Sequence, residues 1–536
     1  MKLLFLFVFA LTFFSCANIT TPSGGPKDLA PPELVSSKPN NKEINYKGQT
    51  IELVFDEYVK LNNPKEEIII SPSPGREIEF KVKGTKVTIT PESKWKDTTT
   101  YSILFRDGIQ DITENNSPIN LKIAFSTGPH IDSLSLAGTI TDLLSGEATE
   151  KITVAIYSQD TFNIFNHSPN YFTKTNKKGA FQIENIKDGN YKIYAFEDKN
   201  KNLKVESRTE RFGFISKSLP LHNAIDTLAL SLVMLDSRKL KFSSIRSAGT
   251  ITRVRFNKYI TEFKLESEKE LISSFGDNQT ELNIWSPANL SDSLKAKLSV
   301  KDSLEYNIDS TFYIKSTGKT FKESFKWSLG ENRVDSETGN FFTTLEFNKP
   351  LININFDSIY IEIDTVNRIN FTKKDFVIDE AHKLIDVRKE IDKKLFKTET
   401  PPRLKLKAGN AFVYSIDNDT SKKLSDEIII YWPESTGILH IQTDTKEKFF
   451  IIQLLNAKGK IAFSVFNQSK YTFKNLNPEE YQIRIVIDKN QNKKWDPGNF
   501  EKKIEPEKVI FYKTSTGKTK FPIRANWELG PLIIKF

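Results

Sequence analysis

The sequence predicts an all-β protein of tandem β-sandwich modules, and three observations support this class. Phe, Ile, Thr and Val outnumber strong helix formers along most of the 536 residues, with 40 Phe against 2 Met, and this composition favours strands. Short stretches of alternating apolar and polar residues recur between turn residues, as in residues 77–83, which read EIEFKVK. Residues 191–202 are repeated as residues 481–492, so two modules share one fold.

The chain begins with a predicted signal peptide, residues 1–15. Lys2 precedes about a dozen apolar residues, a run too short to span a bilayer. Cys16, the single cysteine, follows directly. This pattern resembles a bacterial lipoprotein cleavage site, which implies a diacylglycerol on the Cys16 thiol, although Phe13 stands where Leu is usual. The alternative is a stray thiol in an ordinary secretory signal. Residues 16–33 are polar and predict a tether.

The charge pattern argues against nucleic acid as a partner. The formal net charge is +9, from 77 Lys and Arg against 68 Asp and Glu. These charges are mixed, and no basic stripe with interleaved aromatic residues is visible. An anionic membrane surface or an acidic partner remains compatible with this balance. Because acylation of Cys16 leaves no free thiol, stability must come from burial alone, and the chain is long enough for several cores.

The first module is expected at residues 34–128. Alternating stretches such as residues 51–55 and residues 86–90 predict its strands. Their order resembles that of bacterial Ig-like domains found in surface-layer and lipoprotein chains. The matching phrases are residues 31–34, 51–59, 101–103 with Asp111, and 125–128. The resemblance implies a β-sandwich without an active site.

Two further modules carry the repeat. In residues 131–235 the successive phrases 136–142, 153–157 and 177–196 resemble the carboxypeptidase regulatory-like, or transthyretin-like, β-sandwich. That module has no peptidase chemistry. The repeat places a second transthyretin-like module at residues 434–536.

The centre of the chain predicts two more Ig-like β-sandwiches, at residues 236–330 and 331–433. Residues 251–258 and residues 343–350 each read like residues 51–56 of the first module. The charged stretch that begins at residue 379 is compatible with a short helix or with a long solvated turn, and the sequence leaves this choice open.

The strongest candidate site is an Asp-x-Asn-x-Asn loop that occurs twice. The candidate ligands are Asp198, Asn200, Asn202 and Glu206 in the first copy, and Asp488, Asn490, Asn492 and Asp496 in the second. Oxygen side chains at alternate positions of a tight loop suit Ca²⁺. The pattern departs from an EF-hand, because Leu203 and Lys493 replace the expected Gly and no Glu stands at position 12. The alternative is that these side chains only cap a hairpin through Asx turns.

Other site signals are weak. Trp495 follows the second polar loop and is predicted to be exposed and to bind a partner, whereas the other five Trp residues are expected in module cores. The five His residues have no metal-ligand spacing, and no nucleophile elbow, Walker loop or dinucleotide fingerprint is present. We therefore expect no enzyme activity; a degenerate hydrolase is the least favoured reading.

The whole chain resembles an outer-membrane lipoprotein type with Ig-like domains from Bacteroidota. Cys16, residues 24–28, residues 31–32 and residues 523–528 carry this resemblance. It implies a non-catalytic, lipid-anchored envelope scaffold and an accessory role in an outer-membrane machine for protein assembly or export, whose integral outer-membrane proteins would be its partners. The alternative is a module that binds surface polysaccharide or peptidoglycan. Residues 17–20 contain no acid, which favours the periplasmic face of the outer membrane over the cell surface.

Overall fold

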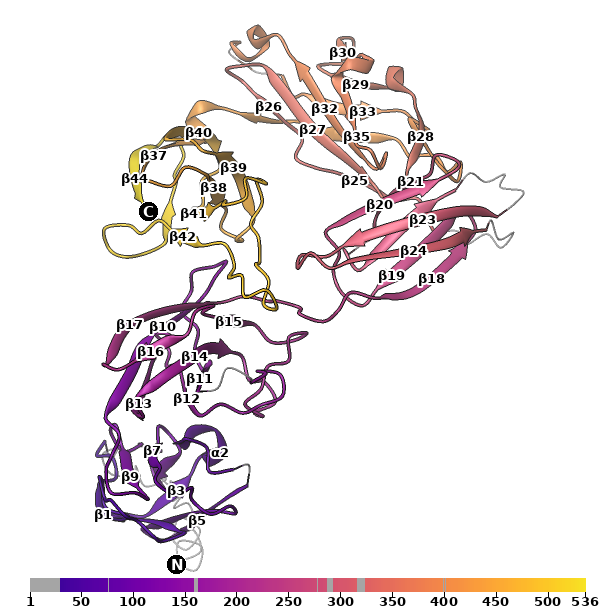
Figure 1. Ribbon diagram of the computed structural model, residues 1–536. Coiled ribbons are helices and arrows are strands. Elements are labelled where there is room, and N and C mark those ends of the chain that lie inside the picture. The colour runs from indigo at the N-terminus through magenta and orange to yellow at the C-terminus, as the bar shows by residue number, and fades with distance from the viewer. Residues whose placement is uncertain are drawn as a thin grey trace, which may run out of the picture.

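The computed structural model describes residues 29–75, 77–158, 162–276, 278–286, 293–315, 323–398, 400 and 402–536. Its elements are almost all strands, which confirms the all-β class, and its sheets form five consecutive groups, here called modules 1 to 5 (Figure 1). Within these residues no helix is long and apolar enough to cross a membrane. The signal peptide, Cys16 and most of the tether lie outside the described residues.

Module 1 is a sandwich of two main sheets. One sheet has the order β1-β2-β6-β5, the other β4-β7-β9, and β3 pairs with β8. Its core holds an aromatic cluster of Trp95, Tyr101 and Phe125 with ring centroids 4.6–5.5 Å apart. The elements are β1 (Leu34–Lys38), β2 (Ile51–Phe55), β3 (Val59–Leu61), α2 (Pro64–Glu67), β4 (Ile69–Ser71), β5 (Ile78–Lys83), β6 (Lys86–Pro91), β7 (Thr100–Leu104), β8 (Ile109–Asp111) and β9 (Lys122–Ser126).

Module 2 packs the sheet β13-β10-β17 against the sheet β12-β11-β14-β15, with β16 also paired to β14. The pair β10 and β17 is parallel, and the other pairs are antiparallel. The strands are β10 (Leu134–Asp142), β11 (Thr153–Tyr157), β12 (Tyr171–Lys174), β13 (Ala180–Ile186), β14 (Gly189–Phe196), β15 (Phe212–Phe214), β16 (Leu219–Leu221) and β17 (Ile225–Leu232).

Module 5 repeats the topology of module 2 strand for strand. Its sheets are β40-β37-β44 and β39-β38-β41-β42, β43 also pairs with β41, and β37 and β44 are again parallel. The internal repeat found in the sequence is therefore a structural repeat. The strands are β37 (Gly437–Asp444), β38 (Phe450–Leu455), β39 (Ile461–Phe466), β40 (Lys470–Leu476), β41 (Glu480–Ile487), β42 (Val509–Phe511), β43 (Lys520–Pro522) and β44 (Glu528–Lys535).

Module 3 packs the sheet β18-β19-β22-β21 against the sheet β20-β23-β24. Its core is aliphatic at the centre, with Val254, Ile284 and Leu298 fully buried. The strands are β18 (Phe242–Ala248), β19 (Ile251–Phe256), β20 (Glu262–Ser267), β21 (Ile272–Phe275), β22 (Glu281–Trp285), β23 (Leu294–Lys301) and β24 (Asn307–Ile314).

Module 4 packs the sheet β31-β32-β27-β26-β36, joined by β25, against the sheet β30-β29-β33-β35, and β28 pairs with β34. The strands are β25 (Trp327–Leu329), β26 (Arg333–Asp335), β27 (Asn340–Phe347), β28 (Leu351–Ile354), β29 (Ile359–Glu362), β30 (Arg368–Asn370), β31 (Phe376–Ile378), β32 (Leu384–Glu390), β33 (Lys405–Ala408), β34 (Val413–Ser415), β35 (Leu424–Glu427) and β36 (Ile429–Tyr431). Short 3-10 helices are η2 (Phe356–Ser358), η3 (Lys373–Asp375), η4 (Lys393–Phe396) and η5 (Pro433–Ser435).

The charged stretch that begins at residue 379 is a turn only at its start, residues 379–383, and then continues as a strand, which the sequence did not predict. Residues 384–390 form β32, which pairs with β27 on one side and β31 on the other. Ile385 and Val387 are fully buried, while Arg388 and Glu390 are exposed. Two apolar residues on alternate positions therefore outweigh the surrounding charges, because a strand needs only one apolar face.

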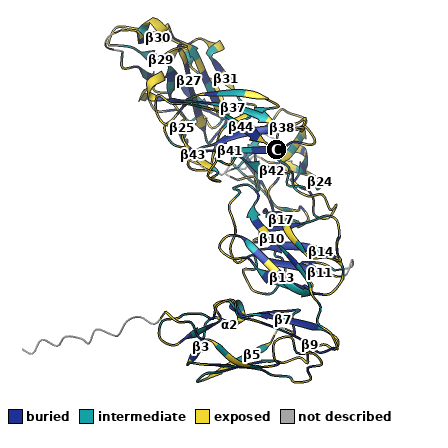
Figure 2. Cartoon of the chain, turned by 90° about the vertical axis from the view of Figure 1, so that its left-hand side faces the viewer, coloured by how far each residue is buried: buried dark blue, intermediate teal, exposed yellow. Residues whose placement is uncertain are grey.

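The modules do not form a linear string. Figure 1 shows that the chain climbs from module 1 through module 2, crosses to modules 3 and 4, and returns so that module 5 lies beside module 2. In Figure 2 buried residues concentrate on the strands inside each module, and exposed residues lie mainly in loops and on outer faces. Modules 2 to 5 thus form a closed arrangement, from which module 1 projects.

Candidate functional site

The first Asp-x-Asn-x-Asn loop connects β14 to β15 and is closed by hydrogen bonds from its own backbone. Asp198 accepts the Asn202 N–H with Oδ1 at 2.9 Å and the Leu203 N–H with Oδ2 at 3.2 Å. Asn200 Oδ1 also accepts the Asn202 N–H, at 3.1 Å, and Asn202 Oδ1 accepts the Lys204 N–H at 2.7 Å. Leu203 has a left-handed φ of 57°, the conformation for which Gly was expected at this position.

The second loop connects β41 to β42 and has the same geometry. Asp488 accepts the Asn492 N–H at 3.1 Å and the Lys493 N–H at 2.9 Å. Asn490 Oδ1 also accepts the Asn492 N–H, at 3.2 Å. The side-chain amides of Asn490 and Asn492 donate to Asp496 Oδ2 at 2.7 and 2.8 Å. Lys493 has a left-handed φ of 62°.

Beneath the first loop lies a buried carboxylate that the sequence pattern did not reveal. Glu210 is 1% exposed and accepts the Lys199 and Glu206 N–H groups at 2.8 Å each. Glu206 itself accepts from the Asn202 amide at 2.8 Å, while its Oε2 is buried without a hydrogen-bond partner. Burial, followed by the neighbouring Glu206 carboxylate, raises the pKa of Glu210 to about 7.

Glu507 has the corresponding position in the second loop. It accepts the Lys489 N–H at 2.8 Å and the Asp496 N–H at 3.1 Å, and burial raises its pKa. No spacing pattern connects the two acids, because Glu210 follows the first Asp of its loop by 12 residues and Glu507 by 19. Only the folded loops show that they are equivalent.

Both loops contain Asx-turn hydrogen bonds. The Asp and Asn oxygens accept backbone N–H groups that the tight turns leave unpaired. Within the described ranges no three His, Cys, Asp or Glu side chains are grouped so that they could hold a metal ion. Calcium bound by the oxygens of the two loops remains a prediction.

The prediction that Trp495 is exposed is wrong. The indole is half-buried and packs against an apolar cluster of module 2 formed by Tyr157, Tyr194, Phe196 and neighbouring residues. Its Nε1–H donates to the Glu507 carbonyl at 3.1 Å. The partner of Trp495 in this structure is thus the protein's own second module, which the sequence could not reveal because 290 residues separate Trp495 from Val205 of that cluster.

Phe500, which the sequence analysis missed, makes the closest aromatic contacts of this junction. Its ring lies against four rings of module 2, with centroids 5.5 Å from Phe165, 6.2 Å from Tyr194, 5.5 Å from Phe212 and 5.2 Å from Phe214. The interplanar angles are 66–89°, the edge-to-face geometry that aromatic pairs prefer. Residues 488–508, called the return loop below, therefore join module 5 to module 2 through an apolar contact.

Polar contacts surround this apolar contact. Glu505 accepts from the Ser216 N–H and Oγ–H at 2.8 and 2.7 Å. The return loop also reaches module 3, where Asn499 donates to the Leu304 carbonyl at 2.6 Å and Lys502 pairs with Glu305 at 2.8 Å. One loop thus holds three modules together.

A second contact between modules 2 and 5 involves the outer face of β41. Arg484 Nη1 donates to the Leu144 carbonyl at 2.9 Å, and its Nε donates to Gln453 Oε1 at 2.8 Å. Burial lowers the pKa of Arg484. Gly146 lies beside Phe511, and a Cβ there would come within 2.5 Å of the ring. The turn at 143–146 can therefore approach module 5 because it carries no side chain at that point.

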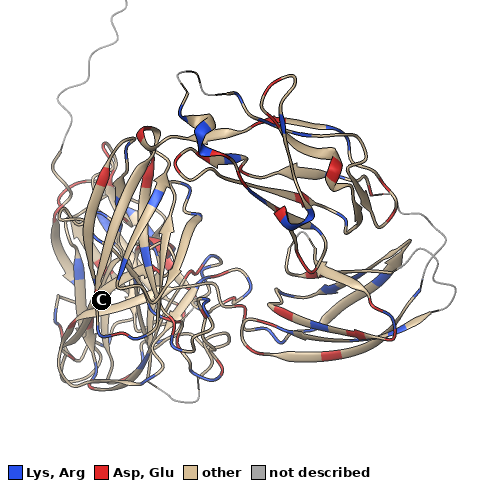
Figure 3. Ribbon diagram, turned by 90° about the horizontal axis from the view of Figure 1, so that it is seen from above, with Lys and Arg blue, Asp and Glu red and all other residues tan. Residues whose placement is uncertain are grey.

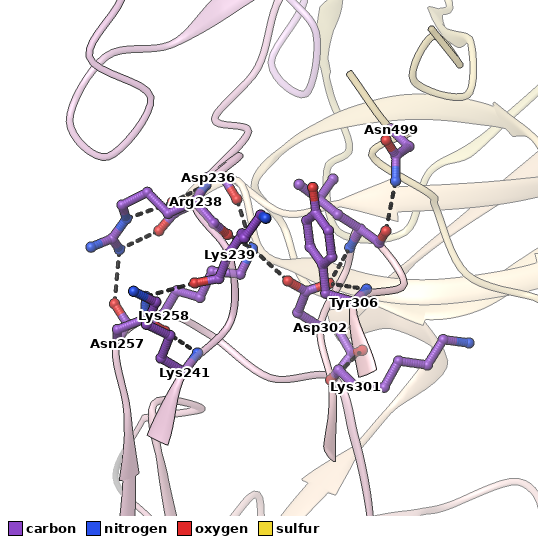
Figure 4. A network of polar contacts seen from close by, with 12 residues as sticks. Asp236, Arg238, Lys239, Lys241, Asn257, Lys258, Lys301, Asp302, Tyr306 and Asn499 are labelled. Atoms are coloured by element: carbon purple, nitrogen blue, oxygen red, sulfur yellow. Dashed lines mark hydrogen bonds and ion pairs between the residues drawn. The ribbon is translucent and has the colours of Figure 1, made fainter. Parts of the chain in front are cut away.

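A buried ion pair fixes the start of module 3 close to the return loop (Figure 4). Lys258 pairs with Asp302, and both side chains are almost completely buried. Lys258 Nζ also donates to the Asp236 carbonyl at 2.9 Å and to the Arg238 carbonyl at 2.6 Å, and it lies 5.0 Å from the ring centroid of Tyr306. Because the ammonium is satisfied by groups from the linker after β17, this network fixes that linker to module 3.

Comparison with protein families identifies parts of the chain. Residues 28–127 match the model of a bacterial Ig-like domain. The first module is therefore Ig-like. Residues 147–207, within module 2, match a model described as polysaccharide lyase family 4, domain II. No curated protein matches the chain. The transthyretin-like assignment of modules 2 and 5 stays an interpretation of their sequence pattern.

Several solved structures of β-rich surface proteins are similar to parts of the chain. The major pilin subunit of Bacillus cereus is 10% identical, over 76% of this chain and 99% of that chain, with a TM-score of 0.14. The S-layer protein rSbsC is 11% identical, over 91% of this chain and 68% of that chain, also with a TM-score of 0.14. TM-scores this low support no argument about arrangement or function.

Proposed function

We propose that this protein is a non-catalytic scaffold of the bacterial cell envelope, anchored in the outer membrane by a lipid on Cys16. The observation that carries the proposal is the closure of modules 2 to 5 into one body. The return loop bonds to modules 2 and 3, and Asn475 of module 5 bonds to Asp335 of module 4. A chain that uses its longest loop to join its own modules is suited to hold partners in fixed positions.

Within this role, the proposed partners are integral outer-membrane proteins, in a machine that assembles or exports proteins. The lipoprotein resemblance of the sequence supports this step, together with the projecting Ig-like module that follows the tether. The absence of acids just after Cys16 favours the periplasmic face. Because fold alone does not define function, the partner complex must be identified by experiment.

Purification from the native membrane tests the proposal. The full chain with a C-terminal tag is extracted in mild detergent and purified from cells that make it at its natural level. We expect integral outer-membrane proteins to co-purify in fixed proportion, and to be lost when detergent is replaced by a denaturing wash. Recovery of the protein alone from such an extract contradicts the scaffold role.

A second candidate function, binding of envelope polysaccharide, is favoured by one cleft. A cavity of about 410 Å³ lies between modules 1 and 2 and is lined by Lys122, Phe172, Gln182 and Glu184 among others. Polar groups around an aromatic ring suit a sugar, and the family model matched inside module 2 is named after a polysaccharide lyase. The chain without its signal peptide and Cys16 would then bind purified envelope polysaccharide, and F172A would weaken this binding. No binding at millimolar sugar excludes the function.

A further inference from the structure

Module 5 presents a free edge of a β-sheet. Strand β39 is the last strand of the sheet β39-β38-β41-β42 within the described residues. It reads IAFSVF, with no charged residue, and Ile461 is 49% exposed. Natural proteins usually protect such edges with charges, Pro residues or a covering element. An apolar edge strand that lacks all three is expected to have a partner.

The unpaired backbone groups of this edge can be assigned from the ladder. Asn467 donates its backbone N–H to the Phe450 carbonyl at 3.0 Å. In an antiparallel pair, the backbone N–H and C=O groups of successive residues point alternately towards the partner strand and away from it. The alternation directs the N–H and C=O groups of Ser464 and Phe466 away from β38 and towards the open edge, where the Phe466 carbonyl accepts only from the exposed Gln468 side chain, at 3.3 Å.

The repeat within the chain shows what covers the equivalent edge. In module 2 the corresponding strand is β12, and the ladders place Phe172 where Ser464 stands in module 5. The Phe172 N–H donates to Ser71 Oγ of module 1 at 3.0 Å. Module 1 therefore covers the outward backbone of β12. The same edge of module 5 has no such cover among the described residues.

The charge around β39 indicates the character of the missing partner. Residues 434–536 hold 18 Lys and Arg against 11 Asp and Glu, so this module accounts for +7 of the net +9. Elsewhere, Lys and Arg are interspersed with Asp and Glu along the strands and loops (Figure 3). Exposed lysines lie near the edge and have no ion pair among the described residues: Lys458, Lys460, Lys470 and Lys493. The Lys493 ammonium lies 5.6 Å from the ring centroid of Phe466.

We infer that β39 binds an acidic, extended segment of another protein, which adds to the sheet as a further strand. The Ser464 N–H and C=O and the Phe466 N–H supply main-chain hydrogen bonds, apolar side chains of β39 supply contact area, and the lysines attract the acidic residues of the segment. The inference rests on the proposed scaffold function and names the chemistry of its partner.

A synthetic peptide tests this inference without the membrane. The probe is a fluorescent nine-residue peptide that alternates Glu with Val or Thr, and its control replaces every Glu with Lys. The protein is the full chain without its signal peptide and Cys16. By fluorescence anisotropy we expect the acidic peptide to bind and to bind about tenfold more weakly in 0.5 M salt, because salt screens exposed charges. The Lys peptide does not bind.

Two variants locate the binding site. S464P removes an outward N–H from an edge strand without removing a ladder hydrogen bond, so the module stays folded while strand addition is blocked. K460E/K470E reverses the charge without changing the backbone. Each is expected to weaken binding at least about tenfold. The matched control K513E/K518E, near the opposite edge of the same sheet, leaves binding within about twofold.

Four results overturn the inference: no binding of the acidic peptide, equal binding of the Lys peptide, unchanged affinity in both edge variants, or a dimer of the free chain that S464P abolishes. The last result shows that the edge pairs with a second copy instead. Failure of the peptide to bind leaves the co-purification experiment unaffected, so the two proposals fail separately.

Discussion

Phe500 and Trp495 lie five residues apart on the return loop, and both contact module 2. The sequence predicted a contact for Trp495 alone, because Trp is rare and the loop around it is polar. Phe500 is one of 40 Phe residues and has no distinguishing neighbours. Whether a side chain fits between two segments that are distant in the sequence depends on the shape of the other segment. The local sequence pattern does not contain that shape.

Replacement of Phe500 tests the junction. We expect F500A to lose about 3 kcal/mol of stabilisation between modules 2 and 5, because four ring contacts are lost and a cavity remains. Small-angle scattering of the full chain would show a larger radius of gyration, and calorimetry would show module 5 melting apart from module 2. F449A, a change to a partly exposed Phe of the same module, is the control. An unchanged radius for F500A contradicts the closure.

Glu210 gives a pH dependence with a defined sign. Its pKa is about 7 in the folded protein, above the ordinary value of about 4.5. The folded state therefore holds a proton that the unfolded state releases, so its contribution to stability is present below about pH 4.5 and is lost as the pH rises towards 7. The effect is at most on the order of 3 kcal/mol, because each unit of pKa difference corresponds to about 1.4 kcal/mol.

We expect E210Q to flatten this dependence. Calorimetric melting of the full chain between pH 5 and pH 8 should show a falling transition for module 2 in the wild type and a smaller slope in E210Q. Only the slopes are compared, since Gln also loses one backbone hydrogen bond. E480Q, at an exposed site of module 5, should keep the wild-type slope. If E210Q kept the wild-type slope of melting temperature against pH, another group would be responsible for the titration.

At the scale of the element, strands followed from the sequence wherever apolar residues alternated, as in β2, β5 and β41. The exception is β32, whose charged residues obscured two alternate apolar positions. The polar loops were recognised from their Asp and Asn residues, and their Asx-turn geometry followed, because these hydrogen bonds are local. Glu210 and Glu507 were missed because the turns bring them under the loops from different sequence distances.

The hydrogen bonds of the second loop predict the effect of D488A. The Lys493 N–H loses its acceptor, and the Asn492 N–H keeps only its bond to Asn490 Oδ1, so we expect a loss of about 1–2 kcal/mol in the transition of module 5. The melting is measured in the presence of a chelator, so the expected loss does not depend on bound calcium. K489A, an exposed neighbour whose N–H stays bonded to Glu507, should change little.

Calcium binding adds a separate expectation for both loops. Millimolar calcium would raise the melting temperature of the wild type, since a ligand that binds the folded state stabilises it, and D488A would lose the share due to module 5. An unchanged melting temperature with and without calcium would mean that the Asp and Asn residues serve only as turn caps.

For the whole molecule, the proposed lipid on Cys16 predicts where the five modules are held. We expect C16A to leave the modules folded, with an unchanged circular dichroism spectrum, and to release the protein into the soluble fraction, because the lipid is the proposed anchor. The K2A variant changes the signal peptide but keeps the cysteine, and it is the control for effects on export alone. C16A protein that stays in membranes stripped of partner proteins contradicts the anchor.

The sequence by itself determined the all-β class and the repeat of module 2 in module 5. These depend on local periodicity and on turn residues, which act over a few positions. The tertiary structure alone decided that module 5 returns to module 2, that Trp495 is half-buried against module 2, that Phe500 fills an aromatic pocket, and that β39 stays open while β12 is covered. Such contacts join surfaces hundreds of residues apart, and their energy depends on shape and burial that no local pattern records.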